Sequence, residues 1–279
     1  MRTLRDRVSV ITGAASGIGR ALAFCLADLG SRLALVDWNA TALDQVVVAL
    51  GQRGVRASAH VVDVSSRPAM EQLARDVIET HGECHLLVNN AGVFLPPLAR
   101  AEEAHIVNVS SLFGLIGVPR NGPYCATKFA VRGLSETLWT ELRGTRIGVT
   151  CVHPGGVQTN IVRNARLRDE AERRAADVEF ARVARMPPER AAERIVRAIE
   201  RNTFRLRLGR ETYVADWMKR LFPTGTQRLV GRLASRVEAP LPLPQGWGTT
   251  PRGEAAGSFL IAAPTFPPAA ANPRRAPPP

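Results

Sequence analysis

The stretch RVSVITGAASGIG, residues 7–19, decides the fold of this chain. Its apolar start, residues 7–11, predicts a short strand, and a helical pattern then runs from Arg20 to Leu29 and stops at Gly30. A strand, a glycine-rich turn and a helix N-terminus in this order form an anion site, because free backbone N–H groups and the helix dipole point at a phosphate. The stretch therefore predicts a nucleotide-binding α/β domain, and the alternative is a glycine-rich turn in some other α/β protein.

A second predicted strand, residues 33–36, ends in Asp37, which lies 18 residues beyond Gly19. This spacing is close to the ~20 residues expected for an acid that binds the adenosine ribose of a dinucleotide. A carboxylate at that position favours NAD(H) over NADP(H), because it repels a 2′-phosphate. The next residue is Trp38, so no cation stands there to offset the repulsion.

Tyr124 and Lys128 belong to a chain that has only two tyrosines and two lysines. Four residues are about one helical turn, so both side chains lie on one helix face. An ammonium beside a phenol lowers the phenol pKa and makes it an acid/base group near neutral pH. Ser111 follows the predicted strand 105–109, from where its hydroxyl can reach the phenol. The alternatives are a solvated helix face for the pair and a helix cap for the serine.

Further motifs stand in the same order as in a known family. Asp63-Val64 resembles a segment that contacts adenine, Asn89-Asn90-Ala91-Gly92 resembles an NNAG turn, and residues 154–159 resemble a PGxxxT segment. From about Arg7 to Gly209, the chain resembles a single-domain short-chain dehydrogenase/reductase with TGxxxGxG and YxxxK motifs. The resemblance implies an α/β fold with a doubly wound, Rossmann-type parallel sheet in one domain.

The resemblance also implies a function. It implies an NAD(H)-dependent oxidoreductase that interconverts a small-molecule alcohol and a ketone or other carbonyl by hydride transfer, with NADP less favoured. Tyr124 would be the acid/base, Ser111 would orient the reacting oxygen, and Lys128 would hold the nicotinamide ribose. The implied cofactor-binding residues are Gly13, Ser16, Gly17, Ile18, Gly19, Asp37, Asp63, Val64, Asn90, Ala91, Gly92, Tyr124, Lys128, Pro154, Gly155, Val157 and Thr159.

The chain departs from the family pattern after the NNAG turn. Only 18 residues lie between Gly92 and Ser111, where the family carries a complete fourth crossover helix with a catalytic asparagine. The predicted crossover between strands 4 and 5, residues 93–104, has about the minimum length that a parallel connection needs. We therefore expect an internal deletion of that helix. A catalytically impaired, nucleotide-binding pseudoenzyme is the alternative function, and the homo-oligomer usual in the family is doubtful because the same helix contributes to its subunit interface.

The rest of the chain predicts its organisation. We expect a domain over residues 1–238, with substrate-capping helices over 163–200, and a disordered tail over 239–279 that holds 11 of the 20 prolines. Apolar residues of the capping segment could line a hydrophobic substrate pocket or form the inner face of packed helices. An amphipathic segment, residues 213–233, could contact an anionic membrane surface. Packing on the domain is favoured, because Pro223 and Gly225 break the helix.

Composition excludes several classes of protein. The net charge of +12 lies mostly after residue 150, where acids are interleaved with the arginines, so no nucleic-acid partner is expected. No apolar run reaches the ~18 residues of a membrane span, and the strand at residue 7 leaves no room for a signal peptide. The four cysteines and five histidines show no metal-binding spacing. We expect no metal, reduced thiols and a cytoplasmic protein.

Overall fold

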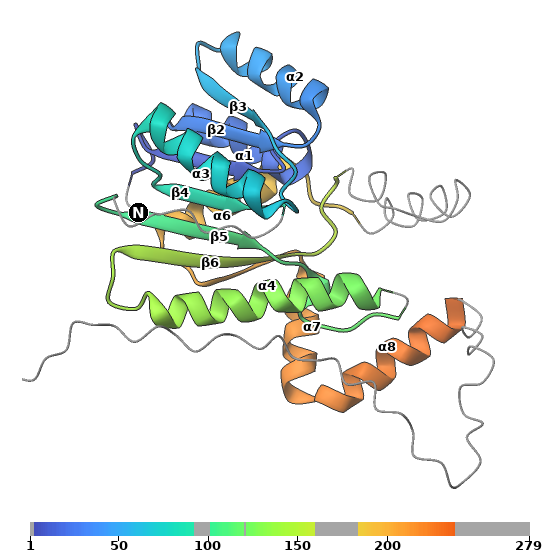
Figure 1. Ribbon diagram of the computed structural model, residues 1–279. Coiled ribbons are helices and arrows are strands. Elements are labelled where there is room, and N and C mark those ends of the chain that lie inside the picture. The colour runs from blue at the N-terminus through green and yellow to red at the C-terminus, as the bar shows by residue number, and fades with distance from the viewer. Residues whose placement is uncertain (1–2, 92–100, 120, 160–183, 238–279) are drawn as a thin grey trace, which may run out of the picture. The chain divides into compact units, whose positions relative to one another are not determined.

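The computed structural model describes residues 3–91, 101–119, 121–159 and 184–237, and everything said of the structure concerns these residues. By its internal contacts the chain divides into two units, Met1–Val237 and Glu238–Pro279. The first unit is built on a parallel sheet of seven strands in the order β3-β2-β1-β4-β5-β6-β7 (Figure 1). The predicted tail and most of the predicted capping segment lie outside the described residues.

The strands alternate with helices along the chain. The strands are β1 (Val8–Thr12), β2 (Arg32–Asp37), β3 (Ala57–Val61), β4 (Leu86–Asn89), β5 (Ala104–Val109), β6 (Ile147–Pro154) and β7 (Arg205–Leu208). The described helices are α1 (Gly17–Asp28), α2 (Ala40–Gly51), α3 (Arg67–His81), η2 (Leu112–Gly114), α4 (Gly122–Glu141), α6 (Pro188–Glu200), α7 (Arg210–Leu221) and α8 (Pro223–Val237). This order and the parallel pairing confirm the predicted doubly wound α/β fold.

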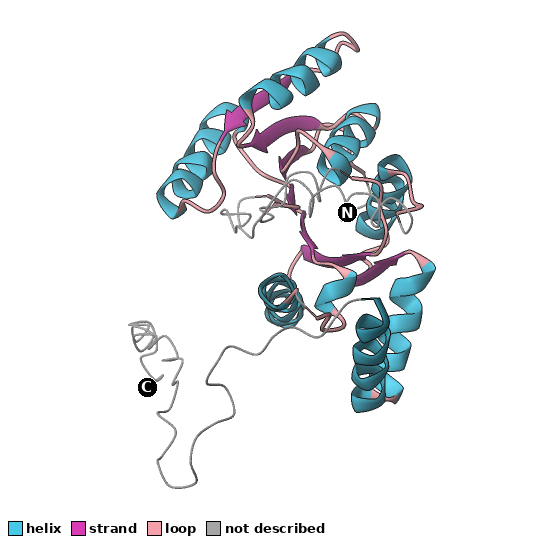
Figure 2. Cartoon of the chain, turned by 90° about the vertical axis from the view of Figure 1, so that its right-hand side faces the viewer, coloured by secondary structure: helices cyan, strands magenta, loops and turns pink. Residues whose placement is uncertain are grey.

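Helices cover both faces of the sheet (Figure 2). On one face, α1, α2 and α6 pack on a core that includes Ile11, Leu35 and Val107. On the other face, α3 packs on a core that includes Val10, Leu87 and Ile106. Helix α4 lies on the same face as α3, because the Asn108 amide of β5 points to it and hydrogen-bonds Ser135. Successive side chains along each strand point to opposite faces of the sheet and thus contribute to two separate cores.

The short connection between β4 and β5 closes the sheet. The two strands pair in parallel, with Leu86 opposite His105 and Asn89 opposite Asn108. Their side chains continue the pairing, since Asn89 Nδ2 donates to Asn108 Oδ1 over 2.9 Å. The connection is therefore long enough to return the chain to the start of a parallel neighbour, although its residues 92–100 lie outside the described part of the chain.

Two helix boundaries differ from those expected from the sequence. Helix α1 begins at Gly17 rather than at Arg20, because the glycines of the motif form its first turn without showing any apolar periodicity. The predicted break at Pro223 is confirmed, since α7 ends at Leu221, but the break expected at Gly225 is wrong, because Gly225 lies inside α8. Proline is the first residue of α8, a position at which its missing N–H has no partner to lose.

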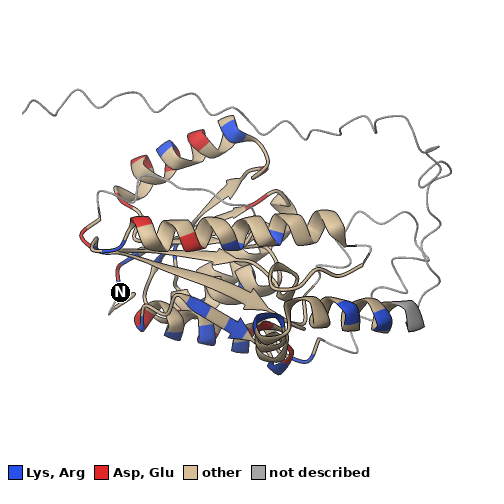
Figure 3. Ribbon diagram, turned by 90° about the horizontal axis from the view of Figure 1, so that it is seen from below, with Lys and Arg blue, Asp and Glu red and all other residues tan. Residues whose placement is uncertain are grey.

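The last two helices are only partly buried. Helix α7 packs on the domain through Thr212 and Asp216, as expected, while Trp217 and Phe222 are 59% and 64% exposed. Helix α8 carries arginines and no acid, whereas α3 interleaves both signs (Figure 3). None of the described helices is long and apolar enough to cross a membrane.

Candidate functional site

The glycine-rich turn after β1 brings its own backbone close to the start of α1. Gly13 has φ +67°, and a Cβ on Gly19 would overlap the Gly13 carbonyl. Both positions therefore require glycine. Ser16 is the N-cap of α1 but makes no side-chain cap hydrogen bond, while Ile18 is buried in the core. The first N–H groups of α1 thus remain without a side-chain cap at the carboxyl edge of the sheet, as an anion site needs.

Thr12 joins this turn to the NNAG turn. Its Oγ1 accepts hydrogen bonds from the Asn90 N–H over 3.2 Å and the Ala91 N–H over 3.0 Å. The same hydroxyl lies 3.3 Å from the Val88 carbonyl, to which it donates. The Asn90 amide donates in turn to the carbonyls of Thr12 and Gly13. The turns after β1 and β4 therefore form one unit, and Gly92 lies outside the described residues.

Asp37 stands at the end of β2, as the sequence predicts, and its carboxylate binds the glycine-rich turn directly. Oδ2 accepts from the Ala15 N–H and Oδ1 from the Asn39 N–H, both over 3.0 Å. The side chain is 7% exposed, while Trp38 is 73% exposed. The carboxylate therefore fixes the turn relative to β2 and places a negative charge beside it.

The remaining cofactor-binding candidates line the same edge of the sheet. Exposed Asp63 accepts from the Ser65 N–H after β3, and Val64 packs beside the α3 core. Pro154 ends β6, and Gly155 then leads to buried Val157, which forms a β-bridge with Met186. Thr159 then reaches Gly17, where an added Cβ would lie 3.0 Å from its Cγ2. The PGxxxT segment therefore meets the start of α1.

Ser111, Tyr124 and Lys128 converge at the end of β5. A hydrogen bond joins the Tyr124 and Ser111 side chains. The Lys128 Nζ lies 5.7 Å from the centre of the Tyr124 ring and donates to the Val109 carbonyl over 3.1 Å. Ser110, which the sequence did not single out, fixes α4 by donating to the Lys128 carbonyl. The three predicted catalytic residues thus form one cluster.

The expected lowering of the Tyr124 pKa is wrong for this structure. Burial raises the pKa of the phenol above its usual value, and only the hydrogen bond from Ser111 acts in the opposite direction. Burial also lowers the pKa of the Lys128 amine. Desolvation therefore affects the pKa values of the two groups more than their proximity does, because the Lys128 amine points at a backbone carbonyl rather than at the Tyr124 phenol oxygen.

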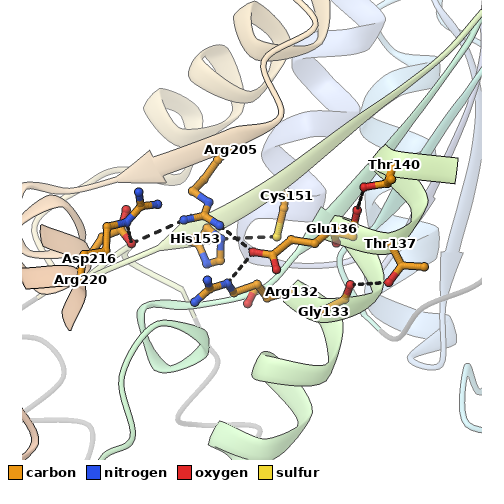
Figure 4. Close-up of polar contacts among 12 residues, drawn as sticks. Arg132, Gly133, Glu136, Thr137, Thr140, Cys151, His153, Arg205, Asp216 and Arg220 are labelled. Atoms are coloured by element: carbon orange, nitrogen blue, oxygen red, sulfur yellow. Dashed lines mark hydrogen bonds and ion pairs between the residues drawn. The ribbon is translucent and has the colours of Figure 1, made fainter. Parts of the chain in front are cut away.

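An ion cluster that the sequence did not reveal joins α4, β7 and α7 (Figure 4). Arg205 of β7 contacts Glu136 of α4 over 2.7 Å and Asp216 of α7 over 3.6 Å. Arg132, Arg207 and Arg220 also belong to the cluster, through Glu136 and Asp216. Because these partners are up to 69 residues apart in the chain, no local sequence pattern predicts their contacts. The cluster ties the helix that carries Tyr124 to the last strand and to α7.

Other features of the described residues lie away from this site. A cavity of about 420 Å³, lined by Arg7, Glu102, Arg146 and Asn202 among others, lies near the starts of β5 and β6, at the opposite edge of the sheet. No group of metal-binding side chains occurs in the described part of the chain. All four cysteines are free, and Cys84 lies just outside β4 rather than in a regular element.

Comparison with known proteins defines the class. The family model for short chain dehydrogenases matches residues 7–96 and 93–170. SadH of Mycobacterium tuberculosis, a protein named as an oxidoreductase, is 36% identical over 264 residues, which cover 82% of this chain and 96% of SadH. The chain belongs to the short-chain dehydrogenase/reductase family, and we class it with the oxidoreductases of that family.

Solved structures agree with this assignment. A short-chain dehydrogenase/reductase from Burkholderia phymatum in complex with NAD is 31% identical, with a TM-score of 0.69 over 87% of this chain and all of that one. L-Sorbose reductase from Gluconobacter frateurii, complexed with NADPH and L-sorbose, shares the fold at 22% identity, with a TM-score of 0.64 over 74% of this chain and 96% of that one. Relatives of this fold thus bind either nicotinamide dinucleotide.

Proposed function

We propose that this chain is an NAD(H)-dependent oxidoreductase that interconverts an alcohol and a carbonyl compound. The observation that carries the proposal is the Ser111–Tyr124–Lys128 cluster, which lies at the same sheet edge as the glycine-rich turn and α1. In parallel α/β sheets, ligands bind at this carboxyl edge. The family assignment supports the reaction class, and the cluster supports the roles of the individual residues.

The chain's residues fit a dinucleotide. The uncapped N-terminus of α1 suits the pyrophosphate, and the carboxylate of Asp37 suits an unmodified adenosine ribose. When bound, the nicotinamide ring supplies the group that accepts or donates hydride. Lys128 would bind the ribose beside that ring. The negative charge of Asp37 and the exposed Trp38 beside it favour NAD(H) over NADP(H).

The chemistry left to the protein is proton transfer at the substrate oxygen. Ser111 donates a hydrogen bond that orients this oxygen, and Tyr124 accepts or returns its proton at the phenol oxygen. The substrate is a small molecule, and we propose a hydrophobic alcohol or ketone. Of the apolar capping residues, Met186 is described and packs half-buried beside the core, while Ile161, Val162, Val178, Phe180 and Val183 lie outside the described residues. Because all four thiols are free, we keep the cytoplasm as the proposed location.

Two variants of the tyrosines test the proposal. Tyr124→Phe should lower the oxidation of a panel of secondary alcohols, followed as NADH formation, by at least about a hundredfold and leave NADH binding intact. Tyr213→Phe is the matched control, since it removes the chain's other phenol, which belongs to α7 and stacks on Arg207. Full activity of Tyr124→Phe would show that another group is the acid/base.

Binding without turnover would select the alternative, a catalytically impaired pseudoenzyme with an intact cofactor site. The observation that keeps this alternative open is the short connection between β4 and β5, which offers no room for a full crossover helix. Calorimetric titration with NADH, and with NADPH for comparison, separates the two cases before any substrate is known. Stronger NADH binding would also support the role of Asp37.

A further inference from the structure

A buried histidine lies directly behind the catalytic serine. His153 of β6 is 0% exposed, and its Nδ1 is 3.2 Å from the backbone carbonyl oxygen of Ser111. Its Nε2 is 3.5 Å from the Sγ of Cys151, two residues earlier in the same strand (Figure 4). The two ring nitrogens therefore have different partners on opposite sides of the imidazole.

These partners fix one tautomer. A carbonyl oxygen can only accept, so Nδ1 must carry the proton. Burial, followed by the charges of Arg205 and Arg132, lowers the pKa of His153 to about 4, although the bond to Ser111 and the charge of Asp216 act in the opposite direction. The ring is therefore neutral near pH 7, and Nε2 carries no proton. Burial raises the pKa of the Cys151 thiol to about 11, so the group facing Nε2 is a protonated thiol.

The His153 imidazole contacts the backbone of Ser111, and other hydrogen bonds hold the Ser111 side chain. Ser111 Oγ accepts from the Phe113 N–H over 3.1 Å, and a further hydrogen bond joins the Ser111 and Tyr124 side chains. The Ser111 backbone is extended, with φ −164°. The Ser111 carbonyl accepts from the Gly114 N–H over 3.0 Å within the same turn, and from His153 of β6. The imidazole thus ties to β6 the backbone that carries the Ser111 hydroxyl.

Resting on the proposed function of this cluster, we propose that His153 is a positioning residue that holds Ser111 in hydrogen-bond contact with Tyr124. It does not touch the substrate. Its effect is transmitted through the Ser111 carbonyl, and it can be measured as a change in the pKa of the Tyr124 phenol.

The test uses the ionisation of Tyr124, which needs no substrate. In a Tyr213→Phe background, Tyr124 is the sole phenol of the chain, and NMR of isotope-labelled tyrosine follows its titration. His153→Phe keeps a ring without a donor, so the Tyr124 pKa should rise above that of the parent. His153→Asn places an amide N–H at the position of Nδ1 and should restore the parental pKa. His153→Gln places it at the position of Nε2, toward Cys151, and should not.

A double-variant cycle separates positioning from general damage. In a Ser111→Ala background, His153→Phe should leave the Tyr124 pKa unchanged, because the Ser111 hydroxyl that links His153 to Tyr124 is absent. If His153→Phe does not fold, the contrast between the Asn and Gln variants decides. Equal Tyr124 pKa values in those two, or a shift that persists without Ser111, would overturn the proposal.

Kinetics then link the proposal to turnover. We expect His153→Phe to lower kcat about tenfold, as for the loss of one hydrogen bond, with NADH affinity unchanged. A wild-type chain that turns over none of the alcohols, while its Tyr124 pKa responds to His153 as described, would refute the proposed function and leave the positioning role standing.

Discussion

Thr12 is the residue on which the two cofactor-binding turns depend most, and Thr12→Val tests this. Valine has nearly the shape of threonine and carries a methyl group in place of the hydroxyl. The side chain is fully buried and makes three hydrogen bonds, to the N–H groups of Asn90 and Ala91 and to the Val88 carbonyl. The substitution leaves all three backbone groups without this partner.

The expected loss follows from these contacts. A neutral hydrogen bond contributes about 1 kcal/mol, and stranding a buried partner costs about 1–3 kcal/mol. Asn90 and Ala91 are only half-buried, so water can reach their N–H groups and the low end of the range applies. The loss of three bonds then lowers the free energy of unfolding by about 3 kcal/mol, which lowers Tm by roughly 6–12 °C for a domain of this size.

Urea unfolding followed by circular dichroism measures the stability, and calorimetry measures NADH binding. Thr137→Val is the control, because that exposed hydroxyl donates only to the Gly133 carbonyl within α4, and its loss should stay within about 0.5 kcal/mol. We expect Thr12→Val also to weaken NADH binding, since the turns after β1 and β4 are no longer joined. Parental stability together with parental NADH affinity would refute the role given to this hydroxyl.

Three further predictions concern the turn, the ion cluster and the phenol. Gly19→Ala should abolish NADH binding in calorimetry, because the added Cβ overlaps a carbonyl of its own turn, whereas Gly51→Ala meets no atom within 4 Å and should bind normally; retained binding in Gly19→Ala would contradict the close approach. Asp216→Asn should cost about 3 kcal/mol in urea unfolding, while Asp28→Asn, whose carboxylate is 68% exposed, should cost almost nothing. Burial raises the Asp216 pKa, but the hydrogen bond and charges of the surrounding arginines outweigh it and lower that pKa. The stabilisation by Asp216 is therefore complete above the unfolded carboxyl pKa and disappears as the pH falls through the folded value; an Asn variant that loses stability in acid just as the parent does would disprove this. In the proposed reaction, alcohol oxidation requires the phenolate of Tyr124, whose pKa burial raises. The kcat/KM for oxidation should therefore increase with pH up to that pKa, and a flat profile would contradict the assignment.

The sequence predicted what local pattern and spacing determine. The strand before the glycine-rich turn, the acid at the end of the second strand and the strand before Ser111 all stand where expected, because each depends on a few adjacent residues. The sequence could not decide whether a minimal crossover closes the sheet, since that depends on how β4 and β5 pair.

Burial explains the remaining differences at the site. Spacing placed Lys128 beside Tyr124 but did not reveal how strongly both are desolvated, so the expected direction of the Tyr124 pKa was reversed. The contact of His153 with Ser111 joins residues 42 apart in the chain and has no periodic signature. A sequence pattern relates residues that are near one another in the chain. It therefore does not predict side chains that act through tertiary contacts.

The short connection between β4 and β5 also bears on the order in which the chain folds. Asn89 and Asn108 pair across 19 residues, whereas the contact of Val8 with His85 between the first strand and the fourth spans 77. The entropy of loop closure grows with the logarithm of length, which favours the shorter loop by about 1.2 kcal/mol. A relative with a full crossover helix has less of this advantage. In this chain the β4–β5 pair can therefore form early, and the pairing of β1 with β4 follows as a later, long-range event.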